Sequence, residues 1–316
     1  MNQPLISIII PCWNGERLVG EAIESALAQT YAHVEVIVID DGSTDESLRV
    51  VQSFGDRVRW ESGINRGACA ARNRGLTLSR GEMVQFLDAD DTLSPRKLET
   101  MVAPAIANGP NCITYCHWQT QEGDVIRECR PSFDGTDPVT WLILNNVTTS
   151  APLHFRERLL KVGGFAPALQ CCQEYDLHLR LATSGSSLIS LNEILILIRR
   201  QPNSVSSSHV KVIRQHYDVY TSLVADLENR EALTPDRRKA IATAYGRDGR
   251  LLVRKGLAKQ GTAFFKRSRE LSPDGFSAAF PHPLTRQIAN CVGGNTAEQI
   301  ANLAARWTLR HNQKSF

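Results

Sequence analysis

The sequence predicts an α/β protein with a doubly wound, mixed sheet, followed by a helical C-terminal region. Short apolar runs alternate with segments whose apolar residues recur at helical spacing, a pattern typical of βαβ units and a mostly parallel sheet. After residue 206 the composition shifts and only helical patterns remain. We therefore divide the chain into two halves of one sheet domain, residues 1–105 and 106–206, and a helical region at 207–316.

The composition is that of an ordinary globular protein. Of the 316 residues, 42% are hydrophobic and 22% are charged, and the net charge of +3 is too small to indicate nucleic-acid binding. The longest apolar runs, Leu5–Ile10 and Ile194–Ile198, are far shorter than the ~20 residues of a membrane span. The N-terminal residues lead into a strand rather than a secretory signal. We expect a cytoplasmic protein whose membrane contact, if any, is peripheral and at the inner face.

The first third of the chain contains four expected strands. These are Leu5–Ile10, Val34–Ile39, Val58–Trp60 and Met83–Leu87. The first is wholly apolar except for Ser7 and stops at Pro11, as expected of a strand buried on both faces. Helices are expected from about Glu16, after a cap at Ser43 or Thr44, and at Ala68–Leu78. In such sheets, ligands bind beyond the carboxyl ends of the strands.

The second part of the sheet should be mixed, because the strand–helix rhythm breaks between residues 108 and 138. A helix is expected to begin near Ser94-Pro95. Later strands are expected at Ile113–His117, Val125–Cys129, Leu188–Leu191 and Ile194–Arg200, and short helices at Trp141–Leu144, Glu157–Val162 and Tyr175–Thr183. The segment from Arg230 to Glu270 contains twelve Lys and Arg residues but only four Asp and Glu residues. This excess could face an anionic membrane surface or a lipid-linked substrate, and a solvated helix face is the simpler alternative.

Three carboxylates crowd the end of the fourth expected strand, namely Asp88, Asp90 and Asp91. Carboxylates this close repel one another unless a positive charge lies among them. A divalent cation, held by oxygen ligands together with a substrate's phosphates, is the expected counter-charge. Asp-rich turns also cap helices, so this pattern alone leaves both interpretations open.

Other signatures are absent from the sequence. No Gly-x-Gly-x-x-Gly follows the first expected strand and no Gly-x-x-x-x-Gly-Lys-Ser/Thr occurs, which argues against a dinucleotide oxidoreductase or a P-loop enzyme. The eight cysteines include no Cys-x-x-Cys, and we interpret them as core residues or free thiols. Cys112, Cys116, His117 and Cys129 match no usual zinc-ligand spacing, which favours a structural role for them as well.

Five motifs follow one another between residues 11 and 91. They are Pro11-Cys-Trp-Asn14, Ser25-x-Leu-x-Gln-Thr30, Glu35–Asp45, Asn65-Arg-Gly67 with Arg72-Asn-Arg-Gly75, and Phe86-Leu-Asp-Ala-Asp-Asp91. In order and spacing they closely resemble the nucleotide-binding half of family 2 glycosyltransferases, inverting enzymes with the GT-A fold, which is Rossmann-like with a mixed sheet. The resemblance continues through Gly163-Gly-Phe165 and Gln173–Arg180 to about Ser206, and it does not cover residues 207–316.

The resemblance implies a site for a nucleotide-diphosphate sugar, most simply a UDP-sugar. Pro11, Trp13 and Asn14 would line the nucleobase pocket, where the indole offers a face for stacking. Asp41 would accept a hydrogen bond from a base N–H group, while Asp40 braces the same turn. A packed aromatic at Trp13 and an ordinary strand-to-helix turn at the two aspartates are the alternatives.

The resemblance also assigns the charged groups of the donor site. Arg72 is the foremost candidate for contacting the diphosphate, although arginines on helix faces are commonly solvated. Asp88 resembles the carboxylate that contacts the ribose or the metal shell, and Asp90 resembles the direct Mn²⁺ or Mg²⁺ ligand. Asp91 would be a supporting ligand or a brace of the loop. A cation bridging the diphosphate offsets charge on the leaving group.

The segment Gln173–Asp176 matches the family's acidic motif, with Gln173-Glu174 in place of the usual Glu-Asp pair. Glu174 would be the general base that takes the proton of the acceptor hydroxyl. Asp176 belongs to the same catalytic motif, but lies roughly 200° further round a helix, where it would cap or brace. An acidic first turn favoured by the helix dipole is the alternative for both. His178 on this helix would touch the acceptor or be a structural histidine.

A second departure from the family concerns the metal. Many relatives carry a histidine where this chain has Gln201, a poorer ligand, and His209 eight residues on is more simply a surface residue. Metal binding would then rest on the aspartates and the diphosphate.

The sequence therefore predicts an inverting, metal-dependent glycosyltransferase with a saccharide or lipid-linked saccharide acceptor. A catalytically degenerate sugar-nucleotide binder is the alternative. A sugar-1-phosphate nucleotidylyltransferase is a weaker one, because Pro11–Gly15 lacks the basic, Gly-rich loop that such an enzyme needs.

Overall fold

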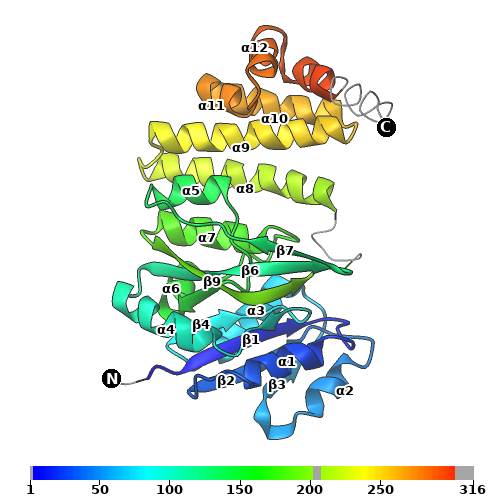
Figure 1. The fold of residues 1–316 in the computed structure, drawn as a ribbon, viewed down its shortest axis with the longest axis vertical. Coiled ribbons are helices and arrows are strands. Elements are labelled where there is room, and N and C mark those ends of the chain that lie inside the picture. Colours follow the sequence, from blue (N-terminus) through cyan, green and yellow to red (C-terminus); the bar gives the residue numbers. More distant parts are fainter. Residues whose placement is uncertain (1–2, 202–207, 303–316) are drawn as a thin grey trace, which may run out of the picture. The chain divides into compact units, whose positions relative to one another are not determined.

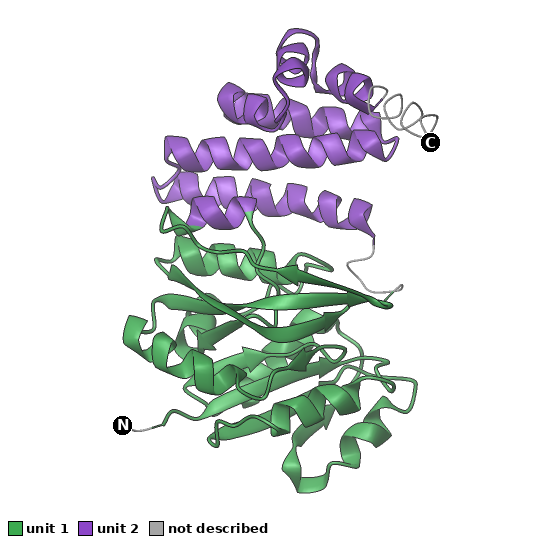
Figure 2. Ribbon diagram, in the orientation of Figure 1, with its two compact units in different colours: residues 1–138, 145–207 green, residues 139–144, 208–316 purple. Residues whose placement is uncertain are grey.

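The computed structural model describes residues 3–201 and 208–302 of the chain. The chain forms two compact units (Figure 2). Unit 1 comprises residues 1–138 and 145–207, and unit 2 comprises residues 139–144 and 208–316. Unit 1 contains the sheet and unit 2 is helical (Figure 1). The roles assigned above to residues 1–105, 106–206 and 207–316 stay predictions.

Unit 1 is built on a nine-stranded mixed sheet. Its strands are β1 (Ile6–Cys12), β2 (Val34–Asp40), β3 (Arg59–Ser62), β4 (Met83–Phe86), β5 (Thr92–Leu93), β6 (Cys112–Glu122), β7 (Val125–Cys129), β8 (Pro152–Phe155) and β9 (Ser187–Arg199). The order is β3-β2-β1-β4-β8-β6-β9-β5, with β7 paired to β6. Strands β1 to β4 are parallel, whereas β8 runs antiparallel to both β4 and β6. The predicted α/β class with a mixed sheet is confirmed.

The helices of unit 1 connect these strands. They are α1 (Val19–Leu27), α2 (Ser47–Gln52), a 3₁₀ turn at Gly55–Arg57, α3 (Ala68–Leu78), α4 (Lys97–Asn108), α6 (Arg156–Lys161) and α7 (Gln173–Thr183). Helix α1 buries one apolar face, formed by Val19, Ala22, Ile23 and Ala26. Helix α3 has the predicted bounds and packs on β1 and β2.

Two of the strand predictions are corrected. Strand β1 does not stop before Pro11 but continues to Cys12. Pro11 is tolerated because β4 pairs with β1 only up to Ile9, so no hydrogen bond to β4 is lost through the missing N–H of Pro11. The two strands expected around residues 188–191 and 194–200 are one strand, β9. Its register against β6 jumps from Leu191 to Ile194, so residues 192–193 form a bulge rather than a break.

The helix starts also differ from expectation. Helix α1 begins at Val19 rather than Glu16, and α2 begins at Ser47 without a side-chain cap. The Ser43 hydroxyl instead accepts a hydrogen bond from the backbone N–H of Asn14, at 2.9 Å, which joins the loops after β1 and β2. Strands β5 and β8 were not predicted, and β5, with two residues, is too short for a periodic pattern.

Unit 2 consists of α5 (Pro138–Leu144, of which residues 139–144 belong to this unit), α8 (His209–Asn229), α9 (Pro235–Arg254), α10 (Ala258–Leu271), α11 (Pro273–Ala278) and α12 (Pro283–Val292). The helical character predicted for the C-terminal region is confirmed over its described residues. A side chain on Gly261 would meet the Gly249 carbonyl oxygen at 2.8 Å, so α10 and α9 approach closely through glycine. Phe265, Phe276 and Phe280 pack edge to face or tilted beside them. Within the described residues, no helix has the length and apolar character needed to cross a bilayer.

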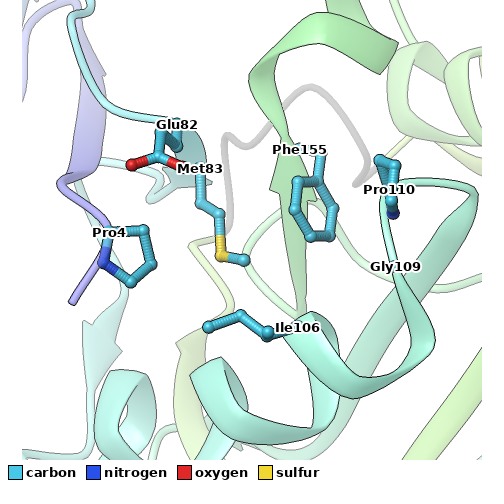
Figure 3. A pocket seen from close by; sticks show the side chains of 7 residues that line it. All are labelled: Pro4, Glu82, Met83, Ile106, Gly109, Pro110 and Phe155. Carbon is cyan, nitrogen blue, oxygen red and sulfur yellow. The ribbon is translucent and has the colours of Figure 1, made fainter. Parts of the chain in front are cut away.

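A hollow of about 260 Å³ opens at the amino end of β4 (Figure 3). Glu82 and Met83 line it together with Ile106 of α4 and Phe155 of β8. It lies at the end of the strand opposite Asp88. Because ligands of such sheets bind at the carboxyl ends of the strands, this hollow is not the expected ligand site.

The close packing of α3 on β1 gives a testable prediction. A Cβ atom on Gly75 would lie 2.3 Å from the Ile9 side chain, whereas a Cβ on Gly20, also within a helix, would meet Val50 at an ordinary 3.5 Å. We expect Gly75→Ala to destabilise the protein by about 1–3 kcal/mol through overpacking. The control Gly20→Ala should raise stability by about 0.4–1 kcal/mol, because alanine restricts the unfolded chain. Calorimetric unfolding of both variants measures this, and equal shifts would contradict it.

Candidate active site

The candidate site lies at the carboxyl end of β4. The backbone N–H of Leu87 donates to the Ile9 carbonyl, so the chain leaves the sheet directly before Asp88. Asp88, Asp90 and Asp91 then form a turn, in which the Asp91 N–H donates to the Asp88 carbonyl at 3.0 Å. The structure thus gathers the three predicted carboxylates in one turn at the edge where ligands are expected.

Asp88 is held by the buried guanidinium of Arg72. One terminal nitrogen of Arg72 donates to the Asp88 carboxylate at 2.5 Å, and the other donates to the Gln173 side-chain oxygen, also at 2.5 Å. The Arg72 side chain is only 7% exposed and its carbon Cζ lies 5.2 Å from the ring centroid of Phe165. Arg72 therefore lies behind the carboxylate turn and ties it to the first residue of α7.

Asp91 is buried and both of its carboxylate oxygens are used within the protein. The Ser150 hydroxyl donates to one oxygen at 3.1 Å, and the backbone N–H of Arg199 donates to the other at 3.2 Å. Burial, followed by the charges of Asp88 and Asp90, raises the pKa of Asp91 well above its usual range. Of the two roles expected for Asp91, bracing of the loop is the one that these bonds support.

Asp90 has no such partners. Within the described residues, its carboxylate makes no hydrogen bond or ion pair with another residue, and only its own backbone N–H contacts it. Burial and, after it, the charge of Asp88 together raise the pKa of Asp90 to about 6, against the lowering effects of its own backbone N–H, Arg199 and Arg72. A half-buried carboxylate without a cation fits a divalent ion bound chiefly by one protein oxygen and by phosphate oxygens of a ligand. Over the residues that the structure describes, no group of three His, Cys, Asp or Glu side chains is arranged for a metal.

The turn after β2 is held by its two aspartates. Both oxygens of Asp41 accept backbone N–H groups, from Arg66 at 2.9 Å and from Gly67 at 2.8 Å, and Asp40 accepts from the Ser62 hydroxyl at 2.6 Å. Asp40 is therefore tied to the end of β3 by this bond, and its role in donor binding stays a prediction. Asp41 positions the loop that leads into α3, and its predicted bond to a nucleobase would use the oxygens that already hold this loop.

The loop after β1 places an indole in solvent. Trp13 is 59% exposed, so it is not the packed aromatic of the alternative interpretation, while Pro11 before it is buried. Asn14 adopts a left-handed conformation, with φ of 50°, and its side-chain oxygen accepts from the Thr44 N–H at 2.8 Å. This bond fixes the loop beside the one that follows β2, with the Trp13 ring face available.

The predicted acidic motif forms the first turn of α7. Cys172 precedes the helix in a left-handed conformation, with φ of 57°, and thereby turns the chain into it. Glu174 accepts a hydrogen bond from the Asn146 side chain at 3.0 Å. Asp176 pairs with Arg180 at 2.7 Å, one turn further along the helix, as a brace would. Asn146 was not identified from the sequence, because nothing local marks a residue that contacts α7 from a loop 28 positions away.

His178 is a buried residue of the core. Its ring stacks on that of His154 at 5.5 Å, and both rings are almost fully buried. Burial lowers the pKa of His178 to about 3, with a smaller contribution from Arg180, and burial also lowers the pKa of His154 well below its usual range. Both imidazoles are therefore neutral near pH 7. Of the two interpretations of His178, the structural one agrees with this position.

The expected metal-binding segment near residue 201 is described only in part. Gln201 is exposed, and residues 202–207, which complete this motif, lie outside the described residues. His209 is the exposed first residue of α8 in unit 2.

A buried polar network supports the carboxylate turn from behind. The Lys97 ammonium, fully buried at the start of α4, donates to the side-chain oxygen of Gln85 in β4. The Gln85 amide in turn donates to the Ser150 carbonyl at 2.8 Å, and the Ser150 hydroxyl contacts both Asp91 and the Asp88 backbone N–H. The only sequence signal for this network was Gln85, the single polar residue in an apolar strand.

Comparison with known proteins identifies relatives of this chain. A family model described as glycosyl transferase family 2 matches residues 7–158. An uncharacterized glycosyltransferase of Rickettsia prowazekii is 29% identical over 241 residues, which cover 73% of this chain and 75% of that protein. The putative colanic acid biosynthesis glycosyl transferase WcaA of Escherichia coli is 28% identical over 239 residues, or 69% and 84% of the two chains.

Solved structures share the fold. The chain matches residues 1–349 of S. aureus TarS with a TM-score of 0.68 and 16% identity, over 95% of this chain and 92% of that one. It spans 55% of the longer TarS chain. A TarS 1–349 structure in complex with UDP-GlcNAc matches with a TM-score of 0.57 at 17% identity, over 87% and 90% of the two chains. The mannosyltransferase PcManGT from Pyrobaculum calidifontis, in complex with GDP-Man and Mn²⁺, matches with 0.61 at 17% identity, over 96% and 88%.

The buried lysine of the network gives a prediction about pH. Burial lowers the pKa of Lys97 to about 8, whereas a lysine in the unfolded chain titrates near 10.4. Between these values the unfolded state binds more protons, so the free energy of unfolding rises with pH, by roughly 3 kcal/mol in all from this group. We expect Lys97→Met to abolish that rise, and the exposed control Lys161→Met to keep it. Urea denaturation of the three proteins from pH 7 to pH 10.5 measures the slopes, and parallel curves for native and Lys97→Met would refute the assignment.

Proposed function

Because the chain belongs to glycosyltransferase family 2, we propose that it transfers a sugar from a nucleotide-diphosphate donor to a hydroxyl group of a saccharide or lipid-linked saccharide, with inversion at the anomeric carbon. The observation that carries this proposal is the Arg72 bridge. It links Asp88, beside the free carboxylate of Asp90, to Gln173, beside Glu174. A donor-side carboxylate and a candidate base are thereby held at one edge of the sheet.

Residues 1–105 would form the donor half of this site. The exposed Trp13 ring offers a stacking face for a nucleobase, and the Asn14 and Asp41 bonds hold the loops on which it lies. UDP is the proposed nucleotide, supported by the UDP-GlcNAc that a structurally similar protein binds. Arg72 would act on the diphosphate indirectly, since its terminal nitrogens already hold Asp88 and Gln173.

Asp90 would be the metal ligand of the site, with Asp88 and Asp91 holding the turn that carries it. A bound Mn²⁺ or Mg²⁺ would supply Lewis-acid stabilisation of the departing nucleoside diphosphate. The Arg72 and Ser150 bonds fix the backbone on either side of Asp90. The turn that carries Asp90 is thus ordered before any ligand arrives, which reduces the cost of ordering on binding.

Residues 106–206 would form the acceptor half, with Glu174 as general base. The Asn146 amide donates to one oxygen of its carboxylate and so orients the group. Glu174 would accept the proton of the acceptor hydroxyl as that oxygen attacks the anomeric carbon from the face opposite the leaving diphosphate. The reaction is one displacement, so it requires no enzyme nucleophile.

The metal role of Asp90 can be tested by binding. We expect UDP to bind the native protein more tightly with Mn²⁺ than with EDTA. Asp90→Ala should lower the affinity in Mn²⁺ by about a hundredfold or more, because even residues that only orient metal ligands contribute 10–100-fold. Isothermal titration calorimetry measures this. The control is Asp56→Ala, which removes an exposed carboxylate from the 3₁₀ turn before β3. UDP affinity that is independent of Mn²⁺ in the native protein would contradict the proposed role.

The role of Glu174 can be tested by turnover. We expect Glu174→Gln to lower kcat by about 10²–10⁴-fold with little change in the KM of the donor, because a positioned base acts only in the transition state. The control is Glu157→Gln, which removes an exposed carboxylate from the first turn of α6 and so matches any effect on a helix dipole. UDP-sugars are screened first for transfer or hydrolysis by the native protein. Unchanged kcat in Glu174→Gln would exclude this residue as the base, and binding without turnover of any donor would favour a degenerate binder.

A further inference from the structure

Unit 2 carries a hollow lined by three arginines. Arg247, Arg250 and Arg254 follow one face of α9 at spacings of three and four residues, and together with Leu251 they enclose about 250 Å³. Nothing in the proposed transfer reaction uses this place. All residues that form it belong to unit 2, so it can be considered from that unit alone.

Two of these arginines are fixed in position by a buried carboxylate. The Glu298 side chain is fully buried, and its oxygens accept from the Nε groups of Arg250, at 2.6 Å, and of Arg254. Arg250 also donates to the Ala279 carbonyl at 2.5 Å and lies over the Phe280 ring, 5.1 Å from its centroid. Both guanidinium groups are therefore ordered before a ligand binds, which removes much of the entropy cost of using them.

The charge of the hollow is not balanced within the described chain. One carboxylate, Glu298, serves two arginines, and Arg247 is exposed and makes no ion pair there. The cluster thus retains two positive charges. The ion pairs of Arg250 and Arg254 with Glu298 are enough to hold the segment around Glu298 against α9. Arg247 takes no part in these ion pairs, so it has no evident role in stabilising the fold.

We propose that this hollow, defined by Arg247, Arg250, Leu251 and Arg254, binds a phosphate or diphosphate group of an anionic ligand. The planar guanidinium fork matches phosphate oxygens, and its remaining N–H groups provide charge-assisted hydrogen bonds. Leu251 is 43% exposed and gives the hollow an apolar wall, which suits the carbon skeleton of a phosphate ester better than a bare ion. The inference does not rest on the proposed transfer reaction, because it concerns binding to unit 2.

The test is a titration of the full chain with inorganic pyrophosphate in EDTA, at constant ionic strength set with chloride. EDTA suppresses metal-dependent binding near Asp90. We expect saturable binding that Arg247→Gln weakens about tenfold, the loss expected for a charge-assisted contact. The matched control is Lys239→Gln, which removes the same charge from an exposed position at the start of α9. Arg247 makes no bond within the described chain, so its replacement should leave folding intact.

If Arg247→Gln and Lys239→Gln weakened binding equally, only the net charge of the protein would matter, and the proposed site would be wrong. The absence of saturable binding would also overturn it.

A second experiment identifies the source of the phosphate. Flotation with vesicles of phosphatidylcholine, with and without phosphatidylglycerol, is compared for the same three proteins. Binding to phosphatidylglycerol vesicles that depends on Arg247 would assign a lipid head group, whereas pyrophosphate binding without vesicle binding would assign a soluble phosphate ester.

Discussion

The site of unit 1 depends on the burial of one guanidinium group. A charge as little exposed as that of Arg72 is tolerated only where it is paired and hydrogen-bonded, and removing one partner of such a pair costs about 3–5 kcal/mol. Asp88 supplies the opposite charge and Gln173 an amide oxygen. If the end of β4 and the start of α7 separated, the buried guanidinium would lose a hydrogen-bond partner, which is costly in an apolar environment. A preorganised edge of the sheet follows from this single constraint.

The same constraint explains how three carboxylates share one turn. Arg72 neutralises Asp88, and Asp91 distributes its charge over bonds from Ser150 and a backbone N–H. Asp90 receives neither kind of help, and burial, followed by the charge of Asp88, raises its pKa. Asp90 is thus the one carboxylate of the turn that no other residue holds, and a hard cation with a diphosphate would supply its partner. Three aspartates within four positions of a sequence do not reveal which of them lacks a partner residue.

Sequence reasoning reached the features that are local and left out those that join distant segments. Helix α3 and strand β7 have the predicted bounds, because periodicity and flanking turns are written into the residues themselves. The contact between Arg72 and Gln173 spans 101 positions, so the sequence could name Arg72 but not the direction of its side chain. The sequence analysis missed the bulge in β9 for the same reason. The register of β9 is set by its pairing with β6, which precedes it by more than sixty residues. Buried Lys97 contradicts the usual exposure of lysine and has no sequence signal of its own.

The departure of Gln173 from the family motif has a physical account in this arrangement. A second carboxylate at this position would compete with Asp88 for Arg72 and would add negative charge beside Glu174. The amide oxygen of Gln173 accepts the hydrogen bond from Arg72, and the amide N–H donates to the Leu169 carbonyl at 3.1 Å, so both ends of the side chain have partners. Arg72 and Asp88 then balance each other as one ion pair. The proposed base, Glu174, is left with a neutral neighbour at Gln173, and its carboxylate accepts a hydrogen bond from Asn146.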